Sequence, residues 1–282
     1  MQAPVRLSEI ADQYEALLCD VWGVVRGGSS LVPEAIEALQ RFRGAGGRVL
    51  LLSNSPRRPE ALLAQLKQMG APDDAFDGAA TSGGAITAEL TARAPGPAFR
   101  LGPEWDGHLY EGTGLEFAPL KDAEFISCTG LFDWEAETPD EYRDLLTEAK
   151  LRRLDMVCAN PDIVVEVDGR LLYCAGALAQ LYEELGGSVV YAGKPHPPIY
   201  DAAYRALEPL LKAPVDKDAI LAIGDGPATD LAGAMAEGLD ALFIADGIVS
   251  GDFRDGFDAD RAAQLLADEG VTARYAAPKL VW

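Results

Sequence analysis

Two patterns of apolar residues alternate along the chain. Short uninterrupted runs are typical of strands buried on both faces of a parallel sheet, and apolar residues recurring every three or four positions are typical of helices covering such a sheet. In the amino-terminal part we expect strands at 14–19 and 49–52 and helices at 33–43 and 59–69. This alternation predicts an α/β fold with a Rossmann-like, doubly wound parallel sheet.

The carboxy-terminal third returns to the same alternation after a long interruption. There we expect strands at 188–191, 219–223 and 241–244, and helices at 198–211, at 261–267 and up to Glu237. The interruption has elements of its own, with strands expected at 98–101, 124–128, 156–159 and 171–174 and helices at 142–151 and 177–185. Gly83-Gly84 and Gly186-Gly187 bracket it, as hinges of an inserted domain would. We therefore expect a core domain at 1–84 and 188–282 and a smaller α/β domain at 85–187.

Composition and charge narrow the classes of partner. The chain has 282 residues, 49% of them hydrophobic, and a net charge of -21. Such a negative field repels nucleic acid and anionic membrane surfaces, so we expect neither as a partner. No apolar run approaches the ~20 residues that span a bilayer, and the first ten residues lack the apolar centre of a signal peptide. These features predict a cytoplasmic protein.

Polar side chains stand where several expected strands end. Asp20 follows the first strand, Ser53 ends the second, and Asp225 follows the apolar run 219–223, while Lys194 lies in a loop after 188–191. The carboxyl ends of parallel strands meet at one edge of a sheet, where open α/β folds bind their ligands. Carboxylate oxygens suit Mg²⁺, and a lysine can neutralise phosphoryl oxygens. The sequence therefore predicts a magnesium and phosphate site with Asp20 as nucleophile.

The order of these motifs resembles that of the haloacid dehalogenase (HAD) superfamily of phosphotransferases. The matching segments are Asp20 to Val24, Leu52 to Ser55, Gly193 to Pro195, and Gly224-Asp225 through Thr229-Asp230. The insert lies where class IIA members carry an α/β cap, and 159–162 and 175–178 are similar to signatures of that cap. The resemblance covers essentially the whole chain. It implies a HAD-like core with an inserted cap that closes over the site.

The resemblance also implies a role for each matching residue. Asp20 would form an aspartyl-phosphate, Ser53 and Asn54 would hydrogen-bond the phosphoryl oxygens, and Lys194 would pair with both the phosphate and Asp20. The Mg²⁺ ligands would be Asp20, the Trp22 backbone carbonyl and Asp225, with Asp230 supporting the ion indirectly. Asn160 and Asp162 in the cap are candidates for substrate contact. The implied activity is Mg²⁺-dependent hydrolysis of a small phosphorylated metabolite, and association through the cap would give a homodimer.

One position departs from the pattern. Phosphatases of the superfamily have a second aspartate two residues after the nucleophile, which serves as general acid and base. Here that position is Trp22, which exchanges no proton near neutral pH. The substrate could have a good leaving group, His196 or His108 could replace the acid, or catalysis could be vestigial. The last outcome would make the protein a binding or regulatory protein for a phosphorylated ligand. An aromatic residue here is also similar to the dehalogenating members, but these need no Mg²⁺, and Asp225 and Asp230 are retained.

Overall fold

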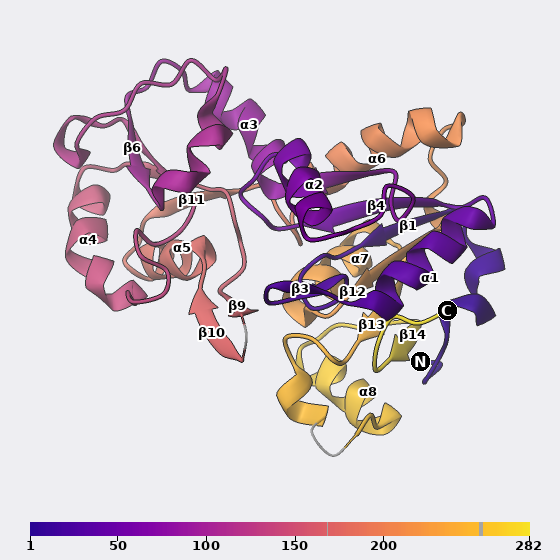
Figure 1. Cartoon of the computed structure of the whole chain (residues 1–282). Coiled ribbons are helices and arrows are strands. Elements are labelled where there is room, and N and C mark those ends of the chain that lie inside the picture. Colours follow the sequence, from indigo (N-terminus) through magenta and orange to yellow (C-terminus); the bar gives the residue numbers. More distant parts are fainter. Residues whose placement is uncertain (168, 254–255) are drawn as a thin grey trace.

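The computed structural model describes residues 1–167, 169–253 and 256–282. Its larger sheet has six strands in the order β14-β13-β12-β1-β4-β5, and every neighbouring pair is parallel. The strands are β1 (Ala16–Cys19), β4 (Arg48–Ser53), β5 (Gly78–Thr81), β12 (Ile220–Gly224), β13 (Asp240–Ile244) and β14 (Tyr275–Ala277). Both ends of the chain contribute to this sheet (Figure 1). The predicted α/β core is therefore confirmed.

Helices cover both faces of the six-stranded sheet. They are α1 (Pro33–Gly44), α2 (Pro59–Gln68), α6 (Pro197–Leu211), α7 (Ala232–Glu237) and α8 (Ala259–Asp268). Successive strand residues point to opposite faces, so Leu17 of β1 packs with the apolar residues of α1 and α2, whereas Leu18 packs with those of α6, α7 and α8. Burial on both faces explains why β1 is apolar at every position.

The segment between the two halves of the core forms a second α/β unit, which we call the cap. Its sheet has the order β11-β8-β7-β6, again with parallel neighbours. These strands are β6 (Ala98–Leu101), β7 (Phe125–Cys128), β8 (Asp155–Cys158) and β11 (Ser188–Tyr191). The helices α4 (Arg143–Leu151) and α5 (Ala175–Glu184) pack on one face, and α3 (Ser82–Ala92) packs on the other.

Two hairpins complete the strands. The cap carries β9 (Val164–Val167) paired with β10 (Arg170–Tyr173), and the core carries the short pair β2 (Arg26–Gly27) and β3 (Ser30–Leu31). The hairpin β9–β10 projects from the cap beside the core (Figure 1). Strand β10 was expected from its sequence, whereas β9 and β5 were not. No helix within the described ranges is both long and apolar enough to cross a membrane.

The structure moves one expected domain boundary and changes the role expected for the glycines at the other. Strand β11 pairs with β8, so it belongs to the cap sheet, and the boundary expected after residue 187 moves beyond Tyr191. Gly83 and Gly84 are no hinge, because both lie inside α3. A Cβ at Gly83 would lie 2.0 Å from the backbone oxygen of Pro56. This glycine therefore serves close packing of the helix against the core, and α3 passes continuously from core to cap.

Candidate active site

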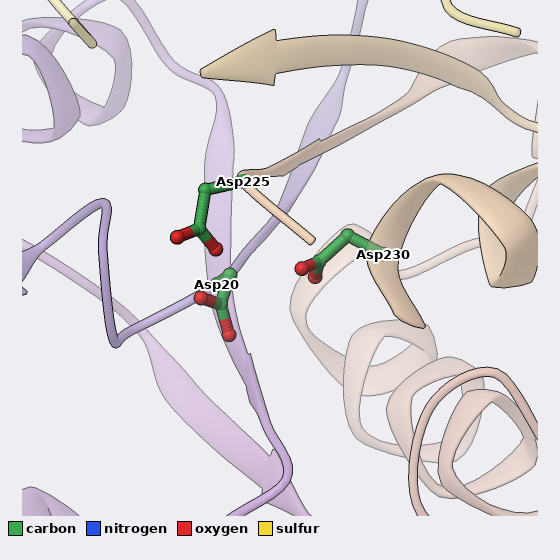
Figure 2. Close-up of side chains that lie close together, drawn as sticks. All are labelled: Asp20, Asp225 and Asp230. Carbon is green, nitrogen blue, oxygen red and sulfur yellow. The ribbon is translucent and has the colours of Figure 1, made fainter. Parts of the chain in front are cut away.

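Three aspartates meet at the carboxyl edge of the six-stranded sheet. Asp20 follows β1, and Asp225 follows β12, which is the neighbour of β1 in the sheet. Asp230 comes from the turn Pro227–Leu231 that leads into α7. Figure 2 shows the three side chains close together. One oxygen of each lies within 4.8 Å of the others, and all three residues are buried.

Lys194 is the cation of this cluster. Its Nζ lies 2.5 Å from Oδ1 of Asp20 and 2.7 Å from Oδ1 of Asp230. The Lys194 side chain is only 2% exposed, so it is held among the carboxylates with little water. A buried charge is tolerated when it is paired and hydrogen-bonded, and here one ammonium faces two carboxylates. The two aspartates thus orient Lys194, and Lys194 offsets part of their mutual repulsion.

Asn54 connects the loop after β4 to the Lys194 loop and to the cap. Its Oδ1 accepts a hydrogen bond from the Lys194 backbone N–H at 2.7 Å, and its Nδ2 donates to the Lys194 carbonyl at 3.1 Å. The same Nδ2 donates to Oδ1 of Asp162 at 2.7 Å. Because Asp162 follows β8, this contact joins the cap to the core at the site. Ser53, the last residue of β4, is buried beside it, and its Oγ accepts from the Ser55 N–H at 3.2 Å.

Asp225 is held by a loop after β13. Its Oδ2 accepts a hydrogen bond from the Ile248 backbone N–H at 2.6 Å. Two glycines leave room for this carboxylate, because a Cβ at Gly23 or at Gly247 would lie 2.0 Å from the same Oδ2. Among the described residues, no hydrogen bond reaches Oδ1 of Asp225 or Oδ2 of Asp20. Two buried carboxylate oxygens therefore remain available at the site.

The donor set fits a divalent cation. Carboxylate oxygens are the ligands that Mg²⁺ prefers, and a dication would offset the excess of negative over positive groups. Asp230 is less available than the other two, because Oδ1 accepts from Lys194 and Oδ2 accepts from the Gly226 N–H at 3.1 Å. Asp20 and Asp225 are therefore the better placed direct ligands.

Burial and repulsion shift the ionisation of the cluster. Burial, together with the neighbouring carboxylates, raises the pKa of Asp20 well above its usual value, although Lys194 opposes the shift. Burial and the Asp230 carboxylate raise the pKa of Asp225 to about 7. Burial alone would lower the pKa of Lys194, but Asp20, Asp230 and Asp162 outweigh it and raise that pKa. These shifts mark a site that holds more carboxylate than one lysine can neutralise.

Trp22 lies at the edge of the site, two residues after Asp20. It is partly buried, packs against the core on the α1 and α2 side of the sheet, and lines the site's cavity. The guanidinium of Arg26 lies over its ring, with Cζ 4.0 Å from the ring centroid. Trp22 is therefore a wall of the cavity held by cation–π and apolar contacts, and its side chain offers no acid.

A cavity of about 1010 Å³ opens above the cluster between core and cap. Of the predicted residues, Asp20, Trp22, Ser53, Asn54, Asp162, Lys194, Asp225 and Asp230 all line it. Asn160 is not among the described lining residues, and its Oδ1 instead accepts from the Asp162 N–H at 3.0 Å, which shapes the turn. Of the two histidines, His196 lines the cavity and His108 is not among the described residues that do.

Several residues that the sequence did not reveal also form this site. Gly247 and the Ile248 N–H come from the loop after β13, and Gln180, Glu183 and Tyr191 line the cavity from the cap. Backbone donors and space-making glycines have no distinctive sequence pattern. Gln180 and Glu183 lie on α5, and polar residues at such positions are typical of the solvent-exposed face of a helix.

Comparison with known proteins agrees with this geometry. The haloacid dehalogenase-like hydrolase model matches residues 17–116, and a second HAD hydrolase-like model matches residues 191–268. A crystal structure of a hydrolase of the haloacid dehalogenase-like family from Brucella suis is 42% identical over 99% of this chain and 100% of its own, with a TM-score of 0.89. The chain belongs to this family. Its inserted cap is that of class IIA of the HAD superfamily.

Two named relatives of this HAD hydrolase are phosphatases. The ribonucleotide monophosphatase NagD of Escherichia coli is 26% identical over 83% of this chain and 88% of its own length. A glycerol phosphate phosphatase from Mycobacterium tuberculosis, solved in complex with calcium, is 25% identical and has a TM-score of 0.62. That match covers 85% of this chain and 68% of the other. This chain is accordingly a hydrolase of the HAD superfamily with named phosphatases among its relatives.

Proposed function

We propose that this HAD hydrolase is a Mg²⁺-dependent phosphatase that cleaves a small phosphorylated metabolite through an aspartyl-phosphate at Asp20. The convergence of Asp20, Lys194, Asp225 and Asp230 carries the proposal. These residues come from three separate segments, yet their charged groups share one buried cluster at the floor of a cavity. Stability alone gives little reason to bury three carboxylates around one lysine.

The chain's own residues supply the steps at phosphorus. An oxygen of Asp20 attacks the phosphorus atom, the bond to the leaving oxygen breaks, and an acyl phosphate forms on the carboxylate. Lys194, already oriented by Asp20 and Asp230, neutralises nonbridging oxygens as charge builds on them. The Ser53 hydroxyl and the Asn54 segment donate hydrogen bonds to the same oxygens. Water then cleaves the acyl phosphate and frees phosphate.

The proposal also assigns the residues that would hold the metal ion. Asp20 and Asp225 would hold Mg²⁺ together with the Trp22 backbone carbonyl, and Asp230 would support the site through Lys194 and Gly226. When bound, the ion stabilises negative charge on the phosphoryl group and reduces its repulsion from Asp20.

The cavity indicates the class of substrate. Its volume accommodates a nucleoside monophosphate or a smaller phosphate ester, the classes named for the two relatives. Away from the cluster its walls carry further carboxylates, namely Glu166, Glu183, Asp246, Asp252 and Glu269. Such walls repel additional phosphates or carboxylates on the substrate. We therefore propose a monophosphate whose remaining part is neutral or cationic.

A panel of phosphate monoesters assayed with Mg²⁺ and with a chelator tests the proposal. We expect release of phosphate that depends on Mg²⁺ and is lost in Asp20→Asn, which keeps the shape of the side chain but not its nucleophilic charge. Asp144→Asn makes the same chemical change at an exposed position on α4 and should behave as the wild type. Full activity of Asp20→Asn would reject the nucleophile, and halide release from a 2-haloacid in chelator would favour dehalogenation instead.

The second candidate function is binding of a phosphorylated ligand with vestigial catalysis, and Trp22 is the observation that favours it. Without a general acid, turnover of an ordinary alkyl phosphate falls by about 10²–10⁴. In that case calorimetry would detect binding of the monoesters in Mg²⁺ while the assay detected almost no phosphate. Ready turnover of alkyl phosphates by the wild type would exclude this alternative.

A further inference from the structure

Attack by Asp20 decides where a proton is needed. In an in-line displacement the leaving oxygen departs on the side of phosphorus opposite the attacking oxygen. Asp20 and Lys194 form the floor of the cavity at the sheet edge, so the leaving oxygen faces the cap. Trp22 supplies no proton, and the cap residues that line the cavity face the departing oxygen.

One cap carboxyl reaches the phosphate-binding residues. Asp162 lies in the turn between β8 and β9, and its Oδ1 accepts the 2.7 Å hydrogen bond from Asn54, whose other amide atom holds the Lys194 backbone. Its own backbone is fixed by two further bonds, from its N–H to Oδ1 of Asn160 at 3.0 Å and from the Gly176 N–H to its carbonyl at 3.1 Å. A Cβ at Gly176 would lie 2.1 Å from the Pro161 carbonyl, so α5 packs directly on this turn. The carboxyl is therefore held in place at the site.

We infer that Asp162 is the general acid and base of this enzyme, taking the role that Trp22 cannot fill. The inference rests on the proposed phosphatase function and assigns the missing proton donor of that reaction. It places the acid on the cap rather than on the strand end that carries the nucleophile. Catalysis then requires the cap to be seated on the core through the contact between Asp162 and Asn54.

The surroundings of Asp162 suit this role. Burial raises its pKa, while Lys194 and the hydrogen bond from Asn54 lower it and Asp230 raises it further. Negative charge brought by a bound phosphate also favours the protonated carboxyl. Asn54 occupies Oδ1, and among the described residues no hydrogen bond reaches Oδ2. This second oxygen is available to carry the proton.

The other titratable cap-side groups are less well placed. His196 is stacked flat on Tyr191, with ring centroids 4.9 Å apart, and burial lowers its pKa, so its neutral form dominates at neutral pH. Glu183 is engaged by the Tyr191 hydroxyl at 2.9 Å. Neither side chain hydrogen-bonds a phosphate-binding residue in the described part of the chain. Glu166, the other cap carboxylate of the cavity wall, is exposed on β9 and makes no such bond in the described ranges either. Among these cap-side groups, Asp162 is the one that hydrogen-bonds a phosphate-binding residue.

The proton balance closes over the two steps. As the Asp20 oxygen bonds to phosphorus, the bond from phosphorus to the leaving oxygen breaks, and the Asp162 proton passes to that oxygen, which departs as an alcohol. A water molecule then attacks phosphorus from the vacated side, gives a proton to the Asp162 carboxylate, and breaks the bond between phosphorus and Asp20. Phosphate is released, and Asp162 is again protonated.

Asp162→Asn tests the inference, because the amide oxygen still accepts from Asn54 but the side chain has no acidic proton. With Mg²⁺ present, we expect kcat/KM for glycerol phosphate and nucleoside monophosphates to fall by about 10²–10⁴, because kcat/KM reports the step that forms the aspartyl-phosphate. For p-nitrophenyl phosphate we expect kcat/KM to fall by less than about 10-fold, because this phenolate leaves without protonation. Loss of the base slows the second step, so kcat should fall for both substrate classes. In Trp22→Asp/Asp162→Asn, an acid at the strand end should restore much of the alkyl phosphate activity. Asp144→Asn is the matched control.

Equal loss of kcat/KM on both substrate classes, or failure of Trp22→Asp to restore kcat/KM for alkyl phosphates, would overturn the inference, since either would mean that Asp162 only seats the cap. If Asp162→Asn does not fold, the inference is tested on the wild-type enzyme. Its kcat/KM over a series of aryl and alkyl phosphates should depend weakly on leaving-group pKa, and a steep dependence would overturn the assignment. A wild type that hydrolyses no monoester with Mg²⁺ would reject the proposed function itself, whereas wild-type turnover of both classes with a uniform loss of kcat/KM in Asp162→Asn rejects only the acid.

Discussion

The Nζ of Lys194 lies 2.5 Å from Oδ1 of Asp20, although 174 positions separate the two residues in the chain. The pairing links a strand end of the core to the loop that returns from the cap. Both groups are buried, so neither charge has much water to replace its partner. Losing one member of such a pair costs more than the pair contributes, because the other charge stays buried.

Replacing Lys194 by Met should therefore impair both catalysis and stability. We expect kcat/KM to fall by about 10²–10³, the usual cost of one donor to a developing oxyanion. We also expect the free energy of unfolding in chelator at pH 8 to fall by about 3–5 kcal/mol, because Asp20 and Asp230 then face each other unneutralised. Phosphate release and urea unfolding measure the two effects. Replacement of Lys217, an exposed lysine paired with Glu237, is the control and should change neither.

Gly247 tests the position of Asp225. Its φ does not require glycine, but a Cβ there would lie 2.0 Å from Oδ2 of Asp225. Gly247→Ala should displace this carboxylate and raise the Mg²⁺ concentration for half-maximal activity by at least ~10-fold, since an ångström of misplacement is costly at a reacting centre. Gly251→Ala lies in the same loop, where a Cβ meets nothing within 4 Å, and should leave the Mg²⁺ titration unchanged. Identical titrations for both variants would refute the assignment of Asp225 as a ligand.

The sequence predicted the positions of Asp20 and Asp225 because each of them directly follows a strand. Asp20 and Asp225 interrupt apolar runs, and parallel strands bring such interruptions to one edge of the sheet. The link between Asp162 and Asn54 is different, since it joins two folded units across 108 positions. The cap signature pointed to Asp162, but no local pattern could name its partner.

Two errors show what a local pattern omits. The apolar run 188–191 predicts a buried strand but does not say which sheet it joins, and only its pairing with β8 puts it in the cap. Gly83-Gly84 was expected as a hinge because this pair and Gly186-Gly187 bracket the inserted segment. In the fold, the absent side chain of Gly83 lets α3 pack against Pro56, and the helix continues through it. Tertiary contact overrides local preference in both cases.

The metal-free protein should lose stability as the pH rises. The pKa of Asp225 is about 7 in the folded state and about 3.9 when unfolded, so between these values the folded state binds more protons. The contribution of this group to stability is fully present below the unfolded value and is lost as the pH rises to about 7, by about 4 kcal/mol at most. Urea unfolding in chelator measures the trend against Asp225→Asn, which should show a shallower decrease. Mg²⁺ should restore stability at pH 8 in the wild type but not in the variant, and equal behaviour of the two proteins would contradict the ionisation of Asp225.

Trp22→Asp distinguishes an enzyme whose general acid is Asp162 from a protein that has no general acid. If Asp162 already donates the proton, a second acid at residue 22 adds little, and we expect kcat for alkyl phosphates to rise by less than about 10-fold. A protein without any acid would instead gain about 10²–10⁴. The substitution also removes the ring beneath Arg26 and its apolar contacts with the core, so the midpoint of thermal unfolding should fall. Trp22→Phe keeps an aromatic wall and should retain activity within a few-fold. A large gain in Trp22→Asp would show that the wild type has no working acid, and a large loss in Trp22→Phe would show that the indole itself contacts the substrate.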